Sequence, residues 1–286
     1  MANKTMEIQP AKTRNSSQPT PDWTPTAAFT GYHPFPPTMN LYYNFSGVLS
    51  ALKTHKLCGA TESDFLYLAE VHFGYTPRGP LNFGRGYYLR NGPTSKAPIL
   101  AAVGDEFRVP YLAALFDTET VVMLPPLDRE KNPTGKVTEV MRSVVGKGHG
   151  VAFRFAVEVS EEKMKREEFE WRKMTGKQDS GEGGLTGSWY TLLRLAPGCR
   201  VASSSKAPPP PLADEDCEIV AELVFGSNML AKHIFRLELK GAGLEGELGE
   251  RWTLMVVMTS LGLWYLRQLG KTHKSTVGAA QKMHSK

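Results

Sequence analysis

Three glycines in the C-terminal part of the chain have the spacing of a phosphate-binding loop. Gly241, Gly243 and Gly246 match the pattern G-x-G-x-x-G between a strand-like and a helix-like segment, where such a loop binds a dinucleotide. A dinucleotide site also needs a second parallel strand and an acidic residue about 20 positions further on. No acidic residue follows Glu250. We therefore interpret the glycines as a tight turn from a strand into a helix.

The densest group of charges lies between Ser160 and Lys173. Five basic residues alternate there with five glutamates. Arginine and lysine bind phosphate and carboxylate groups, so we predict that the basic residues are a site for an anionic ligand. The glutamates weaken the positive field, and the alternative is an edge hairpin that mixed charges keep soluble. The candidate site residues are Lys163, Lys165, Arg166, Arg172 and Lys173.

The other chemistry-bearing residues form no recognisable catalytic or metal-binding pattern. The seven histidines lack H-x-x-x-H and H-E-x-x-H spacing, and there is no G-x-S-x-G motif or P-loop. The adjacent carboxylates Asp105 and Glu106 are predicted to lie in a turn. The three cysteines include no C-x-x-C pair, so we expect no disulfide. We expect no catalytic residue, no metal and no cofactor, and an enzyme of unrecognised type is one alternative.

Composition and charge narrow the class of partner. The chain has 286 residues, 41% of them hydrophobic, and a formal net charge of +5. Five basic residues and no acidic residue follow position 266, so residues 1–266 are neutral overall. A broad basic groove for nucleic acid is therefore not expected. The N-terminus has no apolar signal region, and we predict an intracellular, cytoplasmic monomer that is peripheral to membranes at most.

The pattern along the chain predicts one mostly β domain between two irregular ends. Residues 1–38 are rich in proline and are predicted to be a disordered arm. A domain over 39–270 follows, with long loops at about 127–136, 175–187 and 196–216 and one short helix at 44–55. A basic, disordered tail is expected over 271–286. About ten antiparallel strands are predicted, at 65–73, 86–90, 98–103, 119–124, 136–145, 151–159, 167–173, 188–195, 218–225 and 233–240.

The segment 252–266 carries no charge and is apolar on every side of a helix. Its fifteen residues span about 22 Å as a helix, against about 30 Å for a membrane core. A helix of this kind must be buried all round, which a closed barrel permits. A membrane tail anchor is the second alternative. The side chains expected to lie in the core are Trp252, Leu254, Val257, Met258, Leu261 and Trp264.

Several segments carry a family resemblance. "YYLRNGPTSKAPILAAVGDEF", "REEFEWRK" and "GELGERWTLMVVMTSLGLWYL" resemble the fungal branch of proteins with a tubby C-terminal-like fold. That superfamily includes LURP-one-related proteins and phospholipid scramblases. The resemblance covers about 65–270 and implies an α+β, mostly β fold, in which a roughly twelve-stranded antiparallel barrel encloses a hydrophobic helix at about 251–269.

The resemblance is less specific for function than for fold. No motif aligns with the phosphoinositide-binding residues of tubby domains, so no site residue is transferred from the family. The expected function is that of a non-enzymatic binding or scaffold protein. Its expected partner is an anionic lipid headgroup or another protein.

Overall fold

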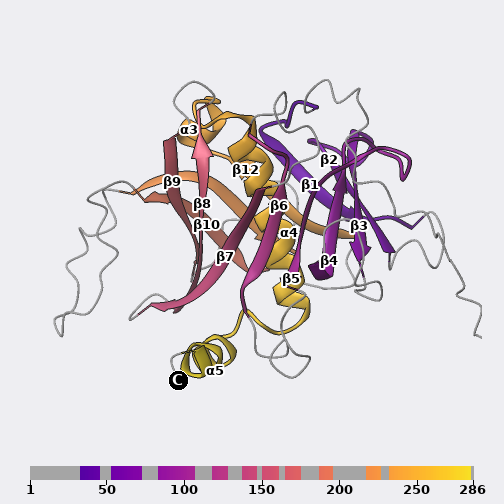
Figure 1. The fold of residues 1–286 in the computed structure, drawn as a ribbon. Coiled ribbons are helices and arrows are strands. Elements are labelled where there is room, and N and C mark those ends of the chain that lie inside the picture. The colour runs from indigo at the N-terminus through magenta and orange to yellow at the C-terminus, as the bar shows by residue number, and fades with distance from the viewer. Residues whose placement is uncertain are drawn as a thin grey trace, which may run out of the picture.

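Twelve strands form a closed antiparallel barrel in which each strand pairs with its neighbours along the chain and β12 returns to β1 (Figure 1). The computed structural model describes residues 33–45, 53–72, 83–106, 118–127, 137–146, 150–160, 165–174, 187–195, 217–226 and 232–284. The strands are β1 (Thr38–Tyr43), β2 (Thr54–Cys58), β3 (Phe65–His72), β4 (Phe83–Arg90), β5 (Ile99–Glu106), β6 (Thr120–Leu124), β7 (Val137–Gly146), β8 (Gly150–Val159), β9 (Lys165–Lys173), β10 (Trp189–Leu195), β11 (Glu218–Phe225) and β12 (His233–Leu239).

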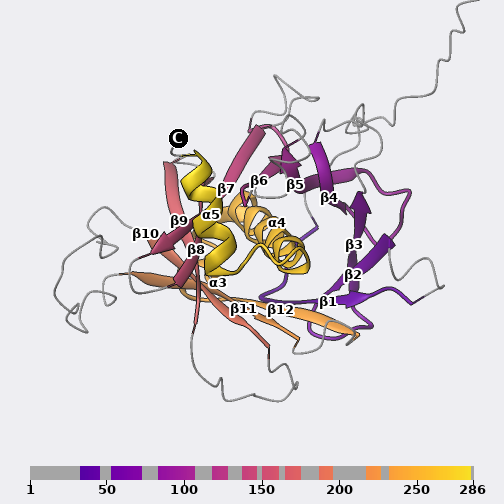
Figure 2. The ribbon, with the colours of Figure 1, turned by 90° about the horizontal axis from the view of Figure 1, so that it is seen from below.

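The helix α4 (Gly249–Gln268) runs through the barrel, and the view from below shows it ringed by strands (Figure 2). Every residue from 254 to 266 is buried. The six side chains expected in the core have exposed fractions of 2% or less. The predicted barrel around an apolar helix is confirmed. Among the described residues, no helix combines the length and the apolar character needed to cross a membrane.

Alternation along the strands supplies the wall that faces α4. In β8 the side chains at 151, 153, 155, 157 and 159 are buried, and those at 154, 156 and 158 between them are more exposed. Aromatic side chains of the wall also contact the helix. Phe169 lies 5.8 Å from Trp252 and Phe225 stacks at 6.0 Å from Trp264, between ring centroids. The core is therefore shared between the wall and the helix.

The glycine motif makes a tight turn, as the sequence predicted. Gly241 and Gly246 have φ angles of 45° and 80°, a region that favours glycine. Gly243 lies in the short helix α3 (Gly241–Leu244), where an added Cβ would lie 2.5 Å from the Trp252 ring. The motif therefore brings the chain from β12 into the barrel.

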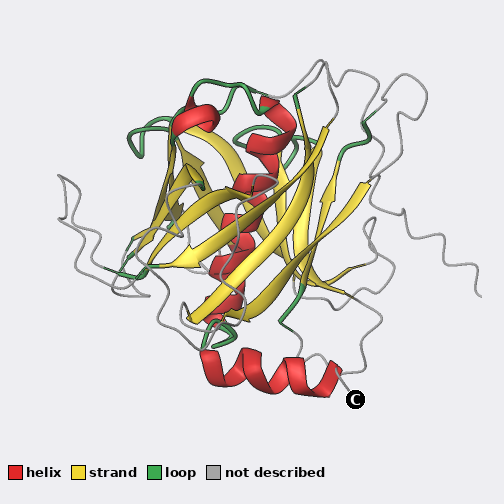
Figure 3. Cartoon of the chain, turned by 90° about the vertical axis from the view of Figure 1, so that its left-hand side faces the viewer, coloured by secondary structure: helices red, strands yellow, loops and turns green. Residues whose placement is uncertain are grey.

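The C-terminal tail differs from the prediction. Residues 274–284 form the helix α5 (Lys274–His284), which lies crosswise at the lower end of the barrel (Figure 3). Val277 and Ala280 on its inner face are buried. The basic residues of the segment had suggested a solvated tail, but two apolar positions three apart are enough to dock the helix.

The described residues include only part of the predicted N-terminal arm and of the predicted loops. Residues 33–37 precede β1 directly, and Phe35 stacks on Tyr67 with 4.8 Å between ring centroids. The prediction of a disordered arm is therefore wrong for 33–38, whereas residues 1–32 lie outside the described part. The predicted loops at 127–136, 175–187 and 196–216 are described only at Leu127 and Gly187.

Two smaller expectations were wrong. Asp105 and Glu106 are the last residues of β5 and do not lie in a turn. The Asp105 side chain is buried and accepts a hydrogen bond of 2.6 Å from the Tyr265 hydroxyl. Cys217 is disulfide-bonded, while Cys58 is a free, buried thiol.

Candidate functional site

The barrel wall opens between β7 and β8. Their ladder has five residue pairs, from Gly146 and Gly150 at the hairpin to Arg142 and Arg154. Beyond that last pair, residues 137–141 pair with β6 and residues 155–159 pair with β9. Figure 1 shows the two strands leaning apart toward the end of the barrel that carries α3. We call the opening the β7–β8 cleft.

The β7–β8 cleft has a volume of about 510 Å³ and a mixed lining. Its apolar part comes from the two strands and from a ring that also belongs to the core. Its charged part comes from three arginines and two glutamates. The lining residues are Thr138, Glu139, Val140, Arg142 and Val144 of β7, Arg154, Phe155 and Ala156 of β8, and Arg166 and Glu168 of β9.

Two like charges face each other at the narrow end of the cleft. Arg142 and Arg154 are direct partners in the antiparallel ladder, a position in which like charges repel. The buried carboxylate of Glu170 pairs with Arg154. Arg142 is 67% exposed, and its Nε lies 3.5 Å from Glu119. Both arginines thus have a carboxylate partner, and the exposed side chain of Arg142, with the longer contact, is the place where a further anion can bind.

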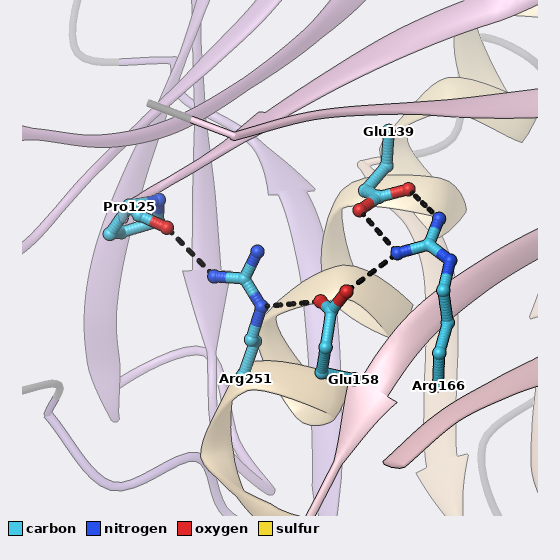
Figure 4. Close-up of polar contacts among 5 residues, drawn as sticks. All are labelled: Pro125, Glu139, Glu158, Arg166 and Arg251. Carbon is cyan, nitrogen blue, oxygen red and sulfur yellow. Dashed lines mark hydrogen bonds and ion pairs between the residues drawn. The ribbon is translucent and has the colours of Figure 1, made fainter. Parts of the chain in front are cut away.

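A chain of ion pairs crosses the cleft at its wide end (Figure 4). Arg166 of β9 donates to Glu139 of β7, with 2.9 Å from Nη1 to Oε1, and to Glu158 of β8 at 2.6 Å. Glu158 also accepts from Arg251 of α4 at 3.2 Å. Arg251 in turn donates to the carbonyl oxygen of Pro125 at 2.7 Å. Side chains therefore bridge the two strands where the backbone ladder has ended.

The same contacts fix the charges in this chain. Burial alone would raise the pKa of Glu158, but hydrogen bonds from the backbone and from Arg166 and Arg251 lower it overall. The hydrogen bonds to Glu139 are the main reason that the pKa of Arg166 is raised. Both groups therefore stay ionised at neutral pH.

The structure does not bring the five predicted site residues together. Lys163 lies outside the described residues. Lys165 pairs with Glu167 at 2.9 Å, and Arg172 is buried against Glu170 at 2.5 Å. Lys173 is exposed and does not line the cleft. Of the four that the structure describes, only Arg166 lines the cleft.

Sequence reasoning missed Arg142 and Arg154, although a signal was present. Both lie in the middle of predicted strands, six residues on either side of Gly148. A hairpin centred on that glycine pairs these two positions. The predicted site consisted instead of basic residues that are close in sequence.

A second hollow lies at the end of the barrel beside α3. Its volume is about 490 Å³, and its lining includes Phe35, Leu244, Glu247 and Glu250. All of its lining residues are described ones, and none of them is basic. Its charged lining residues are acidic, so it does not suit an anion.

The described ranges contain no group of three His, Cys, Asp or Glu side chains placed to hold a metal ion. Comparison with protein-family models, with curated proteins and with solved structures finds no match to this chain.

Proposed function

We propose that the protein is a non-enzymatic binding module and that its β7–β8 cleft recognises an anionic group. The opposition of Arg142 and Arg154 across the ladder carries this proposal. An anion beside the two guanidinium groups accepts paired hydrogen bonds from planar donors. A lipid headgroup and an acidic protein segment can both supply that group.

The lining limits how much negative charge the ligand carries. The three arginines of the lining already pair with Glu119, Glu170, Glu139 and Glu158, which leaves little excess positive charge at the cleft. Glu139 is only 6% exposed and already holds Arg166, so it opposes a second anion at the wide end. The proposed ligand therefore has a single anionic group beside an apolar part, which packs against Val140 and Ala156.

Membership of the tubby C-terminal-like superfamily is part of the same proposal. The twelve-stranded wall around an apolar C-terminal helix supports it, because that is the architecture the resemblance implies. A cytoplasmic location and a monomeric state complete the proposal.

The test is the thermal unfolding of the full chain in phosphate and in chloride at equal ionic strength. We expect phosphate to raise Tm for the wild type by a few degrees, because a ligand that binds only the folded state stabilises it. Arg142→Gln should abolish this difference in Tm, because it removes one of the two facing arginines. The pair of Arg154 with Glu170 stays in place in this variant. The matched control, Lys173→Gln on exposed β9 surface, should keep it.

An equal phosphate effect in Arg142→Gln and in the wild type would mean that the anion acts elsewhere or through bulk solvent. The proposed site would then be wrong.

A further inference from the structure

We infer that the β7–β8 cleft takes an extended acidic segment of a partner protein, which adds as a strand to the open edges of β7 and β8. The contact between its acidic side chain and the arginine pair rests on the function proposed above. The backbone contact rests on a separate observation, the early end of the ladder.

Each strand has a five-residue edge without a ladder partner on the side of the cleft. Residues 137–141 pair only with β6 and residues 155–159 only with β9, within the described part of the chain. Backbone N–H and C=O groups are obligatory hydrogen-bonding groups, and an open strand edge is a template for another strand. An extended peptide that displaces the ion pair of Arg166 with Glu139 supplies the donors and acceptors of a ladder, as in other cases of strand addition.

The side chains around these edges suit an alternating sequence. Val140 of β7 and Ala156 of β8 both line the cleft, and the core residue Phe155 lines it as well. A small apolar residue of the added strand packs between them. A strand alternates its side chains with a period of two, so the next residue on that face reaches the pair of Arg142 and Arg154. An acidic residue is required at that position.

These features favour a peptide over a lipid headgroup. A headgroup could pair with the arginines but would form no ladder with either strand edge. The exposed side chain of Arg142 has room for one carboxylate, whereas a multiply charged headgroup would meet Glu139 and Glu168. The edges, the apolar contacts and the charge therefore agree on one class of ligand.

The experiment measures fluorescence anisotropy of labelled peptides of about seven residues, the length of an ordinary strand, on the full-length protein. The peptides alternate valine and threonine and carry one glutamate, which is moved through every position of the set. We expect at least one register to bind. Replacing its glutamate by lysine, or methylating its backbone nitrogens on alternate residues, should each weaken binding about tenfold or more.

Protein variants and hydrogen exchange complete the experiment. Arg142→Gln should weaken binding as much as the lysine peptide does, and Lys173→Gln should not change it. Amide exchange at 137–141 and 155–159 should slow when the peptide is saturating, because those edges then form hydrogen bonds.

Three results would overturn the inference and separate it from the proposed function. Equal binding of the methylated peptide, or unchanged exchange at both edges, excludes strand addition but leaves anion recognition intact. Failure of the whole set, while phosphate or vesicles containing phosphatidylserine still bind through Arg142, makes a headgroup the ligand. If neither peptide nor phosphate depends on Arg142, both proposals fail.

Discussion

The buried histidine His55 is an uncompensated polar residue inside the barrel. It is 2% exposed, and neither ring nitrogen has a hydrogen-bond partner. The rings of Tyr43 and Tyr87 lie 5.2 Å and 5.5 Å from it, between centroids. Burial lowers the pKa of His55 to about 4. The folded protein therefore holds this imidazole in its neutral form.

That pKa predicts a loss of stability in mild acid. Below pH 6.5, roughly the unfolded value, the unfolded chain binds a proton that the folded chain excludes. The free energy of unfolding should therefore fall by roughly 3 kcal/mol from His55 alone as the pH drops from about 7 to about 4. Urea denaturation across this range, for the wild type and His55→Phe, measures it.

The exposed residue His273 provides the control for His55. His273→Gln should retain the wild-type dependence on pH, and His55→Phe should flatten it. Parallel curves for all three proteins would show that other groups cause the acid sensitivity.

One hydrogen bond joins the wall to the helix inside the core. The Nε1 of Trp171 donates to Oγ1 of Thr259 at 3.0 Å, and both residues are fully buried. Thr259→Val should cost about 1–3 kcal/mol, because it leaves the indole N–H without an acceptor. Thr253→Val on the half-buried first turn of α4 is the control and should cost less. Equal losses in chemical denaturation would contradict this role of Thr259.

At the scale of residues, the sequence could predict burial better than it could predict partners. Alternation and an all-round apolar helix identified core positions such as Val257 and Trp264. The arginine pair was not predicted, because strand register joins residues that are twelve positions apart. The sequence identified the basic residues of 163–173, but only the fold shows which glutamates pair with some of them.

Among the elements, α4 is strongly apolar, and its buried positions cannot accommodate a charged side chain. Val257→Asp should place an unpaired carboxylate in the core and cost several kcal/mol, enough to unfold a marginal domain. Leu244→Asp on the exposed side of α3 is the control, since Leu244 is 53% exposed. Circular dichroism should show a lost or strongly lowered transition for the first variant only. Comparable Tm values would mean that α4 is not tightly enclosed.

Two glycines in helices should respond in opposite ways to alanine. Gly243→Ala would put a methyl group 2.5 Å from the Trp252 ring and 2.6 Å from the carbonyl oxygen of Val220, and should cost about 1–3 kcal/mol. Gly278 in α5 has nothing within 4 Å of an added Cβ. Gly278→Ala should stabilise α5 by about 0.5–1 kcal/mol. Thermal unfolding and amide exchange in 274–284 measure both, and the same sign for the two would be the contrary result.

The ten predicted strands correspond to β3–β12, and the two that were missed, β1 and β2, are short. β1 and β2 have six and five residues, and β1 follows a proline-rich stretch. The segment 44–55 was instead predicted to be a helix, whereas β2 begins at Thr54. Such short strands gain their stability from two neighbours in the closed sheet and not from their own pattern.

For the whole molecule, contact with membranes should be weak and separate from the cleft. Exposed lysines such as Lys173 and Lys274 should give some binding to vesicles of phosphatidylserine. Co-sedimentation should fall steeply between about 0.1 M and 1 M salt, where the Debye length drops from about 10 Å to about 3 Å. Arg142→Gln should leave it unchanged. Loss of vesicle binding in that variant would place a headgroup in the cleft.

The closed wall and the helix inside it depend on each other. A twelve-stranded barrel has a wide interior, and here α4 fills it with side chains from 252 to 266. The two sides of the β7–β8 cleft are held together partly by the polar contacts that end at Arg251 of α4. Removal of α4 should therefore empty the core and loosen the cleft together.

The most direct test of α4 as the core is a chain that ends at Glu250, compared with one that ends at Gly270 and lacks only α5. Size-exclusion chromatography and thermal unfolding should show that the longer chain is folded and somewhat less stable. The chain ending at Glu250 should aggregate or lack a cooperative transition, because its core is hollow. A soluble, monomeric and cooperatively folded protein ending at Glu250 would show that the barrel does not need α4.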